Sequence, residues 1–395
     1  MSVIYAALRT PFGRFGGGLA DVRPDDLAAG VIEALLAKAP LDPARIDDVV
    51  WGNANGAGEE NRNVARMAAL LAGLPVSVPG TTINRLCGSS LDAAFMGSRA
   101  IETGDADVVV VGGVESMTRA PWVLPKPAHG FPAADITAVS STLGWRLVNP
   151  RMRPEWTVSL GEANEQLGER YDVSRERQDE FALRSHRLAA AAWDDGFYDD
   201  LVVPAGDLTS DEGIRPDSSI ESLARLSPSF RPNGTITAGN ASPLSDGASA
   251  LLLGSEAAAS RIGLEPLARI AGRAAFALQP HEFGYAPVEA ARRALARAGV
   301  TWREVGAVEL NEAFAVQSLV CIDAWVGDGL ADPELVNTRG GAIALGHPLG
   351  ASGARILGTL TKVLRERRER WGVAAICIGV GQGLAAVVEN LEVAR

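Results

Sequence analysis

The chain has 395 residues, a net charge of −11 and 47% hydrophobic residues. This length exceeds one ordinary hydrophobic core and predicts two domains with a further lobe. The acidic charge disfavours nucleic acid or an anionic membrane as the main partner, so an anionic ligand would need locally placed basic residues. The three cysteines form no CxxC pair, and no apolar run has the length of a signal peptide or a membrane span, which favours a cytoplasmic location.

Strands and helices alternate through the first part of the chain. The apolar patterns predict strands over residues 2–8, 46–51, 81–86 and 106–111. Between them they predict helices over residues 25–38, 63–71 and 91–102. The last run is continuous in β-branched residues, which is typical of a central parallel strand, and Gly112 and Gly113 are expected to end it. Such alternation predicts a layered α/β domain.

The alternation stops after Met117. Residues from about 118 to 238 are rich in prolines and tryptophans with short helices such as 175–192, and they hold too many apolar side chains for a disordered linker. Strand character resumes at 248–253. We therefore expect a lobe inserted into the first domain.

The remaining chain repeats the element order of the first part. Helices are predicted over residues 287–298, 312–325 and 354–365, and strands over 305–310 and 372–376. A glycine-rich loop at 340–353 precedes the last helix. The expected division is an N-terminal half of 1–117 and 243–264, an inserted lobe of 118–242 and a C-terminal half of 265–395. Two equivalent halves would set their strand-end loops side by side, where ligands bind in open α/β sheets.

Cys87 stands directly before a predicted helix. Unpaired backbone N–H groups and the helix dipole favour an anion at such a position, which predicts a lowered thiol pKa and a nucleophilic thiolate. The structural alternative is an isolated cysteine buried as a small hydrophobic residue.

Three further loops at strand ends carry polar or reactive groups. They contain Asn311, His347 and Cys377. Each has a structural alternative, respectively a turn residue, a histidine that hydrogen-bonds a turn, and a packed thiol. The glycines around His347 and Cys377 allow close approach of a substrate and leave amide groups free to stabilise an oxyanion. Cys321 lies in an apolar helix and is assigned to the core, and no histidine has a partner at metal-ligand spacing.

Several stretches together resemble the signature motifs of the thiolase family, acyl-CoA:acetyl-CoA C-acyltransferases. They are residues 9–13, 84–89, 112–117, 311–314, 340–353 and 377–383, so the resemblance spans the whole chain. Within the family, residues 58–66 and 144–146 and the variant residue Val380 are similar to β-ketoadipyl-CoA thiolases of aromatic degradation. The resemblance implies an α/β fold with two similar βαβ-type halves in α/β/α/β/α layers and an inserted loop lobe.

The resemblance also implies a mechanism, in which CoA cleaves a 3-oxoacyl-CoA to acetyl-CoA or another short acyl-CoA and a shortened acyl-CoA, reversibly as a Claisen condensation. Cys87 would be the nucleophile, His347 its base and Cys377 the general acid and base. His347 with a water held by Asn311 would stabilise the thioester enolate, and the amides of Cys87 and Gly379 the acyl intermediate.

The family further implies CoA as a co-substrate, no permanently bound cofactor, no metal, and a homodimer or homotetramer. CoA would lie against the inserted lobe, and the expected contacts to acyl-CoA are Leu160, Arg215, Ser242 and Phe314.

The chain departs from the family pattern at Ser90, where glycine is usual, and at Pro243 and Ser245, which replace glycine and asparagine. Residues 159–165 lack the histidine of short-chain acetoacetyl-CoA thiolases. The alternatives are a biosynthetic acetoacetyl-CoA thiolase, a decarboxylating ketoacyl synthase and a non-catalytic acyl-CoA-binding protein. Cys377 argues against the synthase, because such enzymes carry histidine or asparagine there.

Overall fold

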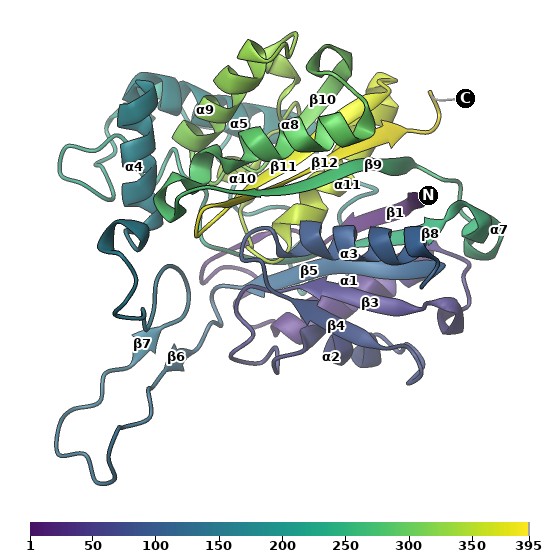
Figure 1. The fold of residues 1–395 in the computed structure, drawn as a ribbon, viewed down its shortest axis with the longest axis horizontal. Helices are drawn as coiled ribbons and strands as arrows, with labels where there is room; N and C mark the ends of the chain where they lie inside the picture. Colours follow the sequence, from purple (N-terminus) through teal and green to yellow (C-terminus); the bar gives the residue numbers. More distant parts are fainter. Residues whose placement is uncertain (394–395) are drawn as a thin grey trace.

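The computed structural model describes residues 1–393 and contains two sheet halves that meet edge to edge (Figure 1). The strand order across both is β10-β11-β12-β9-β1-β8-β5-β3-β4. The first half holds β1 (Ser2–Arg9), β3 (Asp48–Gly52), β4 (Gly80–Ile83), β5 (Val108–Ser116) and β8 (Ser245–Ser255), and the second β9 (Ala268–Ala277), β10 (Val305–Leu310), β11 (Trp371–Ile378) and β12 (Gln382–Asn390). A short antiparallel contact of β1 with β9 joins them.

The pairing pattern of the first half recurs in the second. Strand β3 runs parallel to β5, which is antiparallel to β8, which is antiparallel to β1. In the same way β10 runs parallel to β11, which is antiparallel to β12, which is antiparallel to β9. A parallel bridge from Val308 to Val336 stands where β4 pairs with β3. The predicted repeat of the chain is therefore confirmed.

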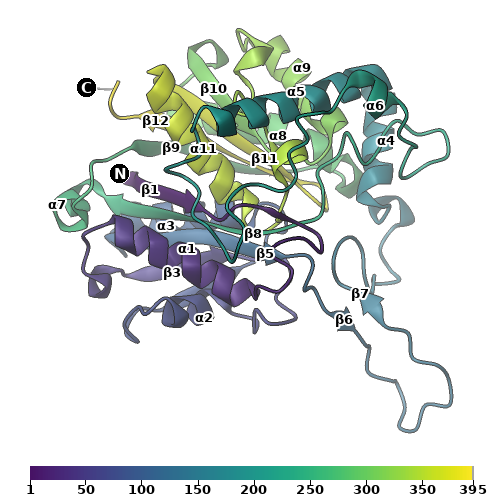
Figure 2. The ribbon, with the colours of Figure 1, turned by 180° about the vertical axis from the view of Figure 1, so that it is seen from behind.

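Helices cover both outer faces of the sheets and fill the space between them. Their bounds are α1 Pro24–Lys38, α2 Val64–Leu71, α3 Ser89–Thr103, α8 Ala286–Ala298, α9 Ala315–Gly327 and α11 Ser352–Arg367. One core cluster joins α3 and α11 to the inner faces of both sheet halves, a second packs α1 and α2 on the first half, and a third packs α8 and α9 on the second. This arrangement confirms the α/β/α/β/α layers (Figures 1 and 2).

The structure differs from the sequence prediction at three strands, β5, β9 and β12. Strand β5 does not end at Gly112 and Gly113 but continues to Ser116, and it is only half parallel because β8 runs against it. A Cβ on Gly113 would lie 1.9 Å from the carbonyl oxygen of Gly350, so glycine serves close approach there and does not end the strand. Strands β9 and β12 were not predicted from the sequence.

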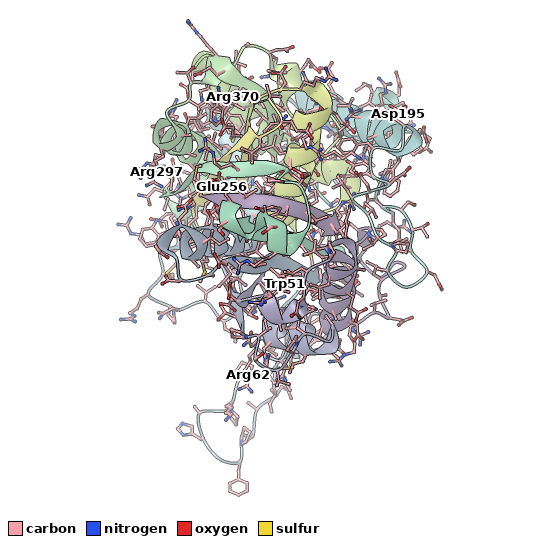
Figure 3. All side chains as sticks on the ribbon, turned by 90° about the vertical axis from the view of Figure 1, so that its right-hand side faces the viewer. Trp51, Arg62, Asp195, Glu256, Arg297 and Arg370 are labelled. Carbon is pink, nitrogen blue, oxygen red and sulfur yellow. The ribbon has the colours of Figure 1, made fainter. Side chains whose placement is uncertain are left out.

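The segment between β5 and β8 forms the inserted lobe. It contains β6 (Trp122–Val123), β7 (Val139–Ser140), α4 (Leu160–Tyr171), α5 (Arg175–Asp194) and α6 (Ile220–Ala224), and α5 confirms the helix predicted there. Figures 1 and 3 show the β6–β7 hairpin and its connecting loop projecting from the layered body. The remaining short elements are β2 (Gly13–Arg14), α7 (Ala259–Ile262) and α10 (Ala342–Leu345). No helix within residues 1–393 is both long and apolar enough for a membrane span.

A substitution at Gly113 tests the close approach of β5 to the loop that precedes α11. Gly113→Ala places a methyl group against backbone that cannot move away, so we expect a loss of about 3 kcal/mol in the free energy of unfolding. Gly30→Ala is the matched control, because nothing lies within 4 Å of a Cβ at this exposed position of α1. It should gain about 0.5–1 kcal/mol. Equal effects of the two variants in urea unfolding would contradict the packing.

Candidate active site

Cys87 lies in a tight turn at the N-terminus of α3. Leu86 adopts a left-handed backbone conformation with φ 47°, and Ser89 Oγ accepts a hydrogen bond from the Arg85 amide at 2.9 Å. A Cβ on Gly88 would lie 2.3 Å from Ile378 Cδ1, so glycine here lets the turn pack closely on the side chain at the end of β11. The turn therefore directs the sulfur toward the other half of the molecule.

A cavity of about 350 Å³ opens onto Cys87. Its lining comes from the turn itself, the residues that follow β3 and β11, the loop of His347, the start of α4 and one segment of the lobe. The lining residues are Ala54, Asn55, Asn84, Leu86, Cys87, 141–146, Leu160, Leu349, Gly379 and Val380. Three sequence-predicted site residues, Cys87, Leu160 and Gly379, thus share one cavity. Cys87 itself is 9% exposed, so a ligand in the cavity has only a narrow approach to this residue.

The protonation of Cys87 differs from the sequence expectation. Burial raises the pKa of the thiol to about 11, while hydrogen bonds from the amides of Gly379 and Cys87 itself lower it by less. Desolvation outweighs these amide hydrogen bonds, so the pKa of the thiol is raised and the prediction of a lowered pKa was wrong. Cys87 rests as a neutral thiol, and a base would have to remove its proton before it could act as a nucleophile.

Cys377 lies at the end of β11 and is 1% exposed. Burial raises the pKa of its thiol well above the usual value, and the neighbouring Cys87 raises it further. The structure thus brings together two sulfurs that lie far apart in the sequence. Cys321 packs inside α9 with its thiol 3.3 Å from the carbonyl oxygen of Gly284, and its assignment to the core is confirmed.

His347 is held by hydrogen bonds that leave one ring nitrogen free of a proton. Ser352 Oγ donates to the Pro348 carbonyl at 3.0 Å, so it accepts from His347 Nδ1–H at 2.6 Å. The Nε2 atom then carries the lone pair, and Asn311 Nδ2 lies 3.3 Å from it. This network assigns the tautomer that a general base requires.

A buried ion pair stands behind this imidazole. Arg355 pairs with Glu309 at 3.2 Å and also donates to Asn311 Oδ1, which turns the amide NH₂ of Asn311 toward His347. Burial, with the charge of Arg355, lowers the pKa of His347 to about 3. The imidazole is therefore neutral at physiological pH and can accept a proton.

Each of two departures from the family pattern makes a hydrogen bond that joins parts of the site. Ser90 Oγ accepts the amide N–H of Ala354 in the first turn of α11 at 2.9 Å. Ser245 Oγ accepts the amide of His347 at 3.1 Å and donates to the Pro243 carbonyl at 2.9 Å. Both serines thus hold the loop that carries His347.

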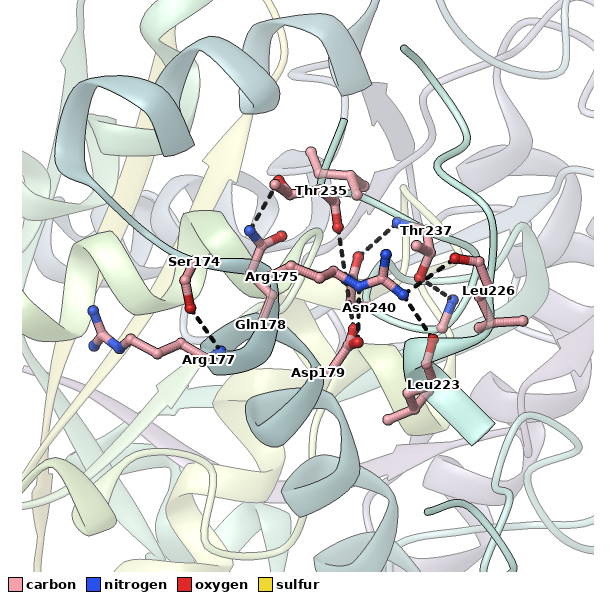
Figure 4. A network of polar contacts seen from close by, with 12 residues as sticks. Ser174, Arg175, Arg177, Gln178, Asp179, Leu223, Leu226, Thr235, Thr237 and Asn240 are labelled. Atoms are coloured by element: carbon pink, nitrogen blue, oxygen red, sulfur yellow. Dashed lines mark hydrogen bonds and ion pairs between the residues drawn. The ribbon is translucent and has the colours of Figure 1, made fainter. Parts of the chain in front are cut away.

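The loop expected to contact CoA lies across the start of α9. The amide and hydroxyl of Ser242 both donate to the Ala313 carbonyl, and a β-bridge joins Ala241 to Phe314. Asn240, which donates to Asp179 of α5 at 2.9 Å, fixes this loop to the lobe (Figure 4). These contacts explain why α9 begins at Ala315 and not at residue 312 as expected from the sequence.

Arg215 is not joined by any described hydrogen bond to the other sequence-predicted site residues. Its side chain is exposed and its amide donates to His186 Nδ1 at 3.2 Å. It does not line the cavity at Cys87.

Sequence reasoning missed the buried residues that fix the loops. The carboxylate of Glu115 accepts the amides of Ala54, Asn55 and Gly350, and so ties the first half to the loop of His347. The Arg355 contact was also missed, because nothing in the sequence marks this charged residue of α11 as buried. Within residues 1–393, no cluster of three or more His, Cys, Asp or Glu side chains is arranged to hold a metal ion.

The raised pKa of Cys87 predicts how its alkylation depends on pH. Only the thiolate reacts with iodoacetamide, so the rate at Cys87 should rise about tenfold per unit between about pH 7 and about pH 9. Peptide mass spectrometry separates Cys87 from the more buried Cys321 and Cys377 and follows each rate. A plateau near neutral pH would contradict a neutral resting thiol.

Comparisons with known proteins agree with this geometry. The family model for the thiolase N-terminal domain matches residues 2–257, and that for the thiolase C-terminal domain matches residues 264–390. The chain is 48% identical to the 3-oxoadipyl-CoA/3-oxo-5,6-dehydrosuberyl-CoA thiolase of Escherichia coli (strain K12), over 97% of this chain and 98% of that one. It is 44% identical to a β-ketoadipyl-CoA thiolase of Acinetobacter baylyi, over 98% and 99%.

The fold matches a solved structure over nearly its whole length. Human mitochondrial 3-ketoacyl-CoA thiolase in complex with CoA superposes with a TM-score of 0.92 at 36% identity, covering 98% of each chain. Two domain models, close relatives and the layered fold agree, so the chain belongs to the thiolase family.

Proposed function

We propose that this protein cleaves a 3-oxoacyl-CoA with CoA, through an acyl group carried on Cys87. The observation that carries the proposal is the cavity that opens onto Cys87, with the buried thiol of Cys377 next to Cys87 and the neutral base His347 on the loop that contributes Leu349 to the cavity. A nucleophile, a base and a second proton carrier are what the two half-reactions require. These roles also weigh against a non-catalytic binding protein.

In the first half-reaction, the Cys87 sulfur attacks the 3-keto carbon of the substrate while its proton passes to His347 Nε2. The bond between C2 and C3 then breaks, leaving the acyl group on the sulfur and the enolate of acetyl-CoA. Cys377 gives its proton to C2 of the enolate, and acetyl-CoA leaves. Because both Cys87 and His347 rest neutral, we expect proton transfer to accompany formation of the carbon–sulfur bond.

In the second half-reaction, the thiol of CoA gives its proton to the Cys377 thiolate and its sulfur attacks the acyl carbonyl. The Cys87 sulfur leaves and recovers the proton held by His347, so that every group returns to its starting state. The amides of Gly379 and Cys87, which donate toward the sulfur in the resting protein, are suited to stabilise the oxyanion of the acyl intermediate.

We further propose that CoA is the co-substrate and lies against the inserted lobe. Ser242, Phe314 and Leu160 would contact its pantetheine arm, and Arg215, which does not line the cavity, would offer charge to its nucleotide end. The CoA complex of the human relative supports a CoA site on this fold. A homodimer or homotetramer in the cytoplasm belongs to the same proposal.

For the acyl group we propose a 3-oxoadipyl chain. The support is the activity for which two relatives are named, which are 44% and 48% identical over almost the whole chain. A biosynthetic acetoacetyl-CoA thiolase remains the alternative within the family.

The proposed role of Cys377 predicts a separation of the half-reactions. Cys377→Ala should still accept an acetyl group from acetyl-CoA, but should lose Claisen condensation and thiolysis by about 100- to 10,000-fold, because no group remains to move the C2 proton. Cys87→Ser is the control and should lose acylation. Intact-protein mass spectrometry and a coupled assay measure the two steps. Unchanged condensation by Cys377→Ala would refute the role.

A substrate panel tests the proposed function as a whole. Thiolysis of acetoacetyl-CoA, 3-oxohexanoyl-CoA, longer unbranched 3-oxoacyl-CoAs and 3-oxoadipyl-CoA is measured under identical conditions. We expect the highest kcat/KM for 3-oxoadipyl-CoA. Highest activity on acetoacetyl-CoA would instead support the biosynthetic alternative, and no thiolysis of any substrate would refute thiolase activity.

A further inference from the structure

The cavity at Cys87 carries one cationic side chain. Of the residues described as lining it, Arg146 alone is charged, and the others are apolar, glycine or neutral polar residues. The protein as a whole has a net charge of −11, so a lone arginine in the cavity that contains Cys87 is not explained by general surface charge. One charged side chain in an otherwise neutral cavity is typical of a site that fixes the orientation of a ligand of opposite charge.

The guanidinium of Arg146 has no carboxylate partner within residues 1–393. Its two contacts, Nη1 to the Ser141 carbonyl and Nη2 to Asn55 Oδ1, are both 3.4 Å long. Arg85, which also lies in the turn that carries Cys87, is instead paired with Asp92 at 2.7 Å and with Gln382. Arginine has five N–H donors in a planar fork that matches a carboxylate, and two long contacts leave most of this capacity unused.

The surroundings fix the position of Arg146 without neutralising it. The side-chain Nδ2 of Asn55 donates to the carbonyl and hydroxyl of Ser141 at 3.1 and 2.9 Å. The backbone amide of Asn55 donates to the carboxylate of Glu115. The neighbouring Trp145 donates its indole N–H to the Val158 carbonyl at 3.0 Å. Asn55, Ser141 and Trp145 themselves line the cavity. The guanidinium therefore stands on a fixed neutral wall of the cavity that contains Cys87.

We infer that Arg146 binds the terminal carboxylate of a dicarboxylic acyl chain and makes the enzyme selective for such substrates. This inference rests on the proposed function, and it assigns the residue that distinguishes a 3-oxoadipyl chain from an unbranched monocarboxylic chain of equal length. The carboxylate of a 3-oxoadipyl chain belongs to the part that remains on Cys87 after cleavage. Arg146 thus binds the same group in the substrate and in the succinyl-Cys87 intermediate, where two methylene groups separate it from the thioester.

Two substrates of equal chain length isolate the contact. 3-Oxohexanoyl-CoA has a methyl group where 3-oxoadipyl-CoA has its terminal carboxylate. We measure kcat/KM for thiolysis of both by the wild-type protein and by Arg146→Gln, and compare the ratio of 3-oxoadipyl-CoA over 3-oxohexanoyl-CoA. Loss of a charge-assisted, part-exposed contact should lower this ratio by about 10- to 100-fold.

Two further variants complete the series. Arg146→Lys keeps the charge but loses the planar fork, so its ratio should lie between those of wild type and Arg146→Gln. Arg151→Gln removes an equal charge from an exposed position in the same segment, outside the cavity lining, and should leave the ratio at its wild-type value. An equal loss on both substrates in Arg146→Gln would indicate a purely structural role and would overturn the inference.

Acylation by succinyl-CoA gives a second readout that does not depend on turnover. Mass spectrometry should find Cys87 succinylated in wild type, and the succinylation rate relative to acetylation by acetyl-CoA should fall in Arg146→Gln by a similar factor. A wild-type protein that cleaves both 3-oxoacyl-CoAs equally well would overturn the inference and leave thiolase activity standing. A protein that cleaves neither would refute the proposed function, and this inference with it.

Discussion

The close contact of two helix N-termini between the sheets is the constraint on which the site depends. A Cβ on Gly353 would lie 2.3 Å from the Leu91 amide nitrogen, and Ala354 donates to Ser90 Oγ, so the first turns of α11 and α3 press directly on each other. One helix is preceded by the turn of Cys87 and the other by the loop of His347. Duplication of one α/β unit thus converts two loops that lie far apart in the sequence into neighbours.

Burial of this contact determines the chemistry. Away from water, both neutral forms are favoured: the pKa of Cys87 rises to about 11 and that of His347 falls to about 3. A standing thiolate–imidazolium pair is therefore disfavoured. In the proposed mechanism, the Cys87 thiolate forms only as its sulfur attacks the substrate carbonyl. Resting neutrality also protects the thiol, because oxidation and alkylation require the thiolate.

The sequence predicted most of the elements that carry the site. Strand β10 and helix α8 lie within one residue of their expected bounds, since their apolar periods are strong. Strands β9 and β12 were missed because alanine, glycine and charged residues are poor strand formers, and pairing in the sheet outweighs that propensity. The lowered pKa of Cys87 was predicted from the helix N-terminus alone, and desolvation cannot be judged before the fold is known. For the same reason Arg355, a charged residue on an amphipathic helix, gave no sign of its complete burial, and the cavity position of Arg146 emerged only with the lobe in place.

A crystal structure of the protein after incubation with acetyl-CoA would test the central claim most directly. The account predicts an acetyl group bonded to Cys87 Sγ, with its carbonyl oxygen about 3 Å from the amide nitrogens of Cys87 and Gly379. It further predicts that the freed CoA thiol lies beside Cys377. An acetyl group on another residue, or one on Cys87 whose oxygen faces away from these amides, would contradict it.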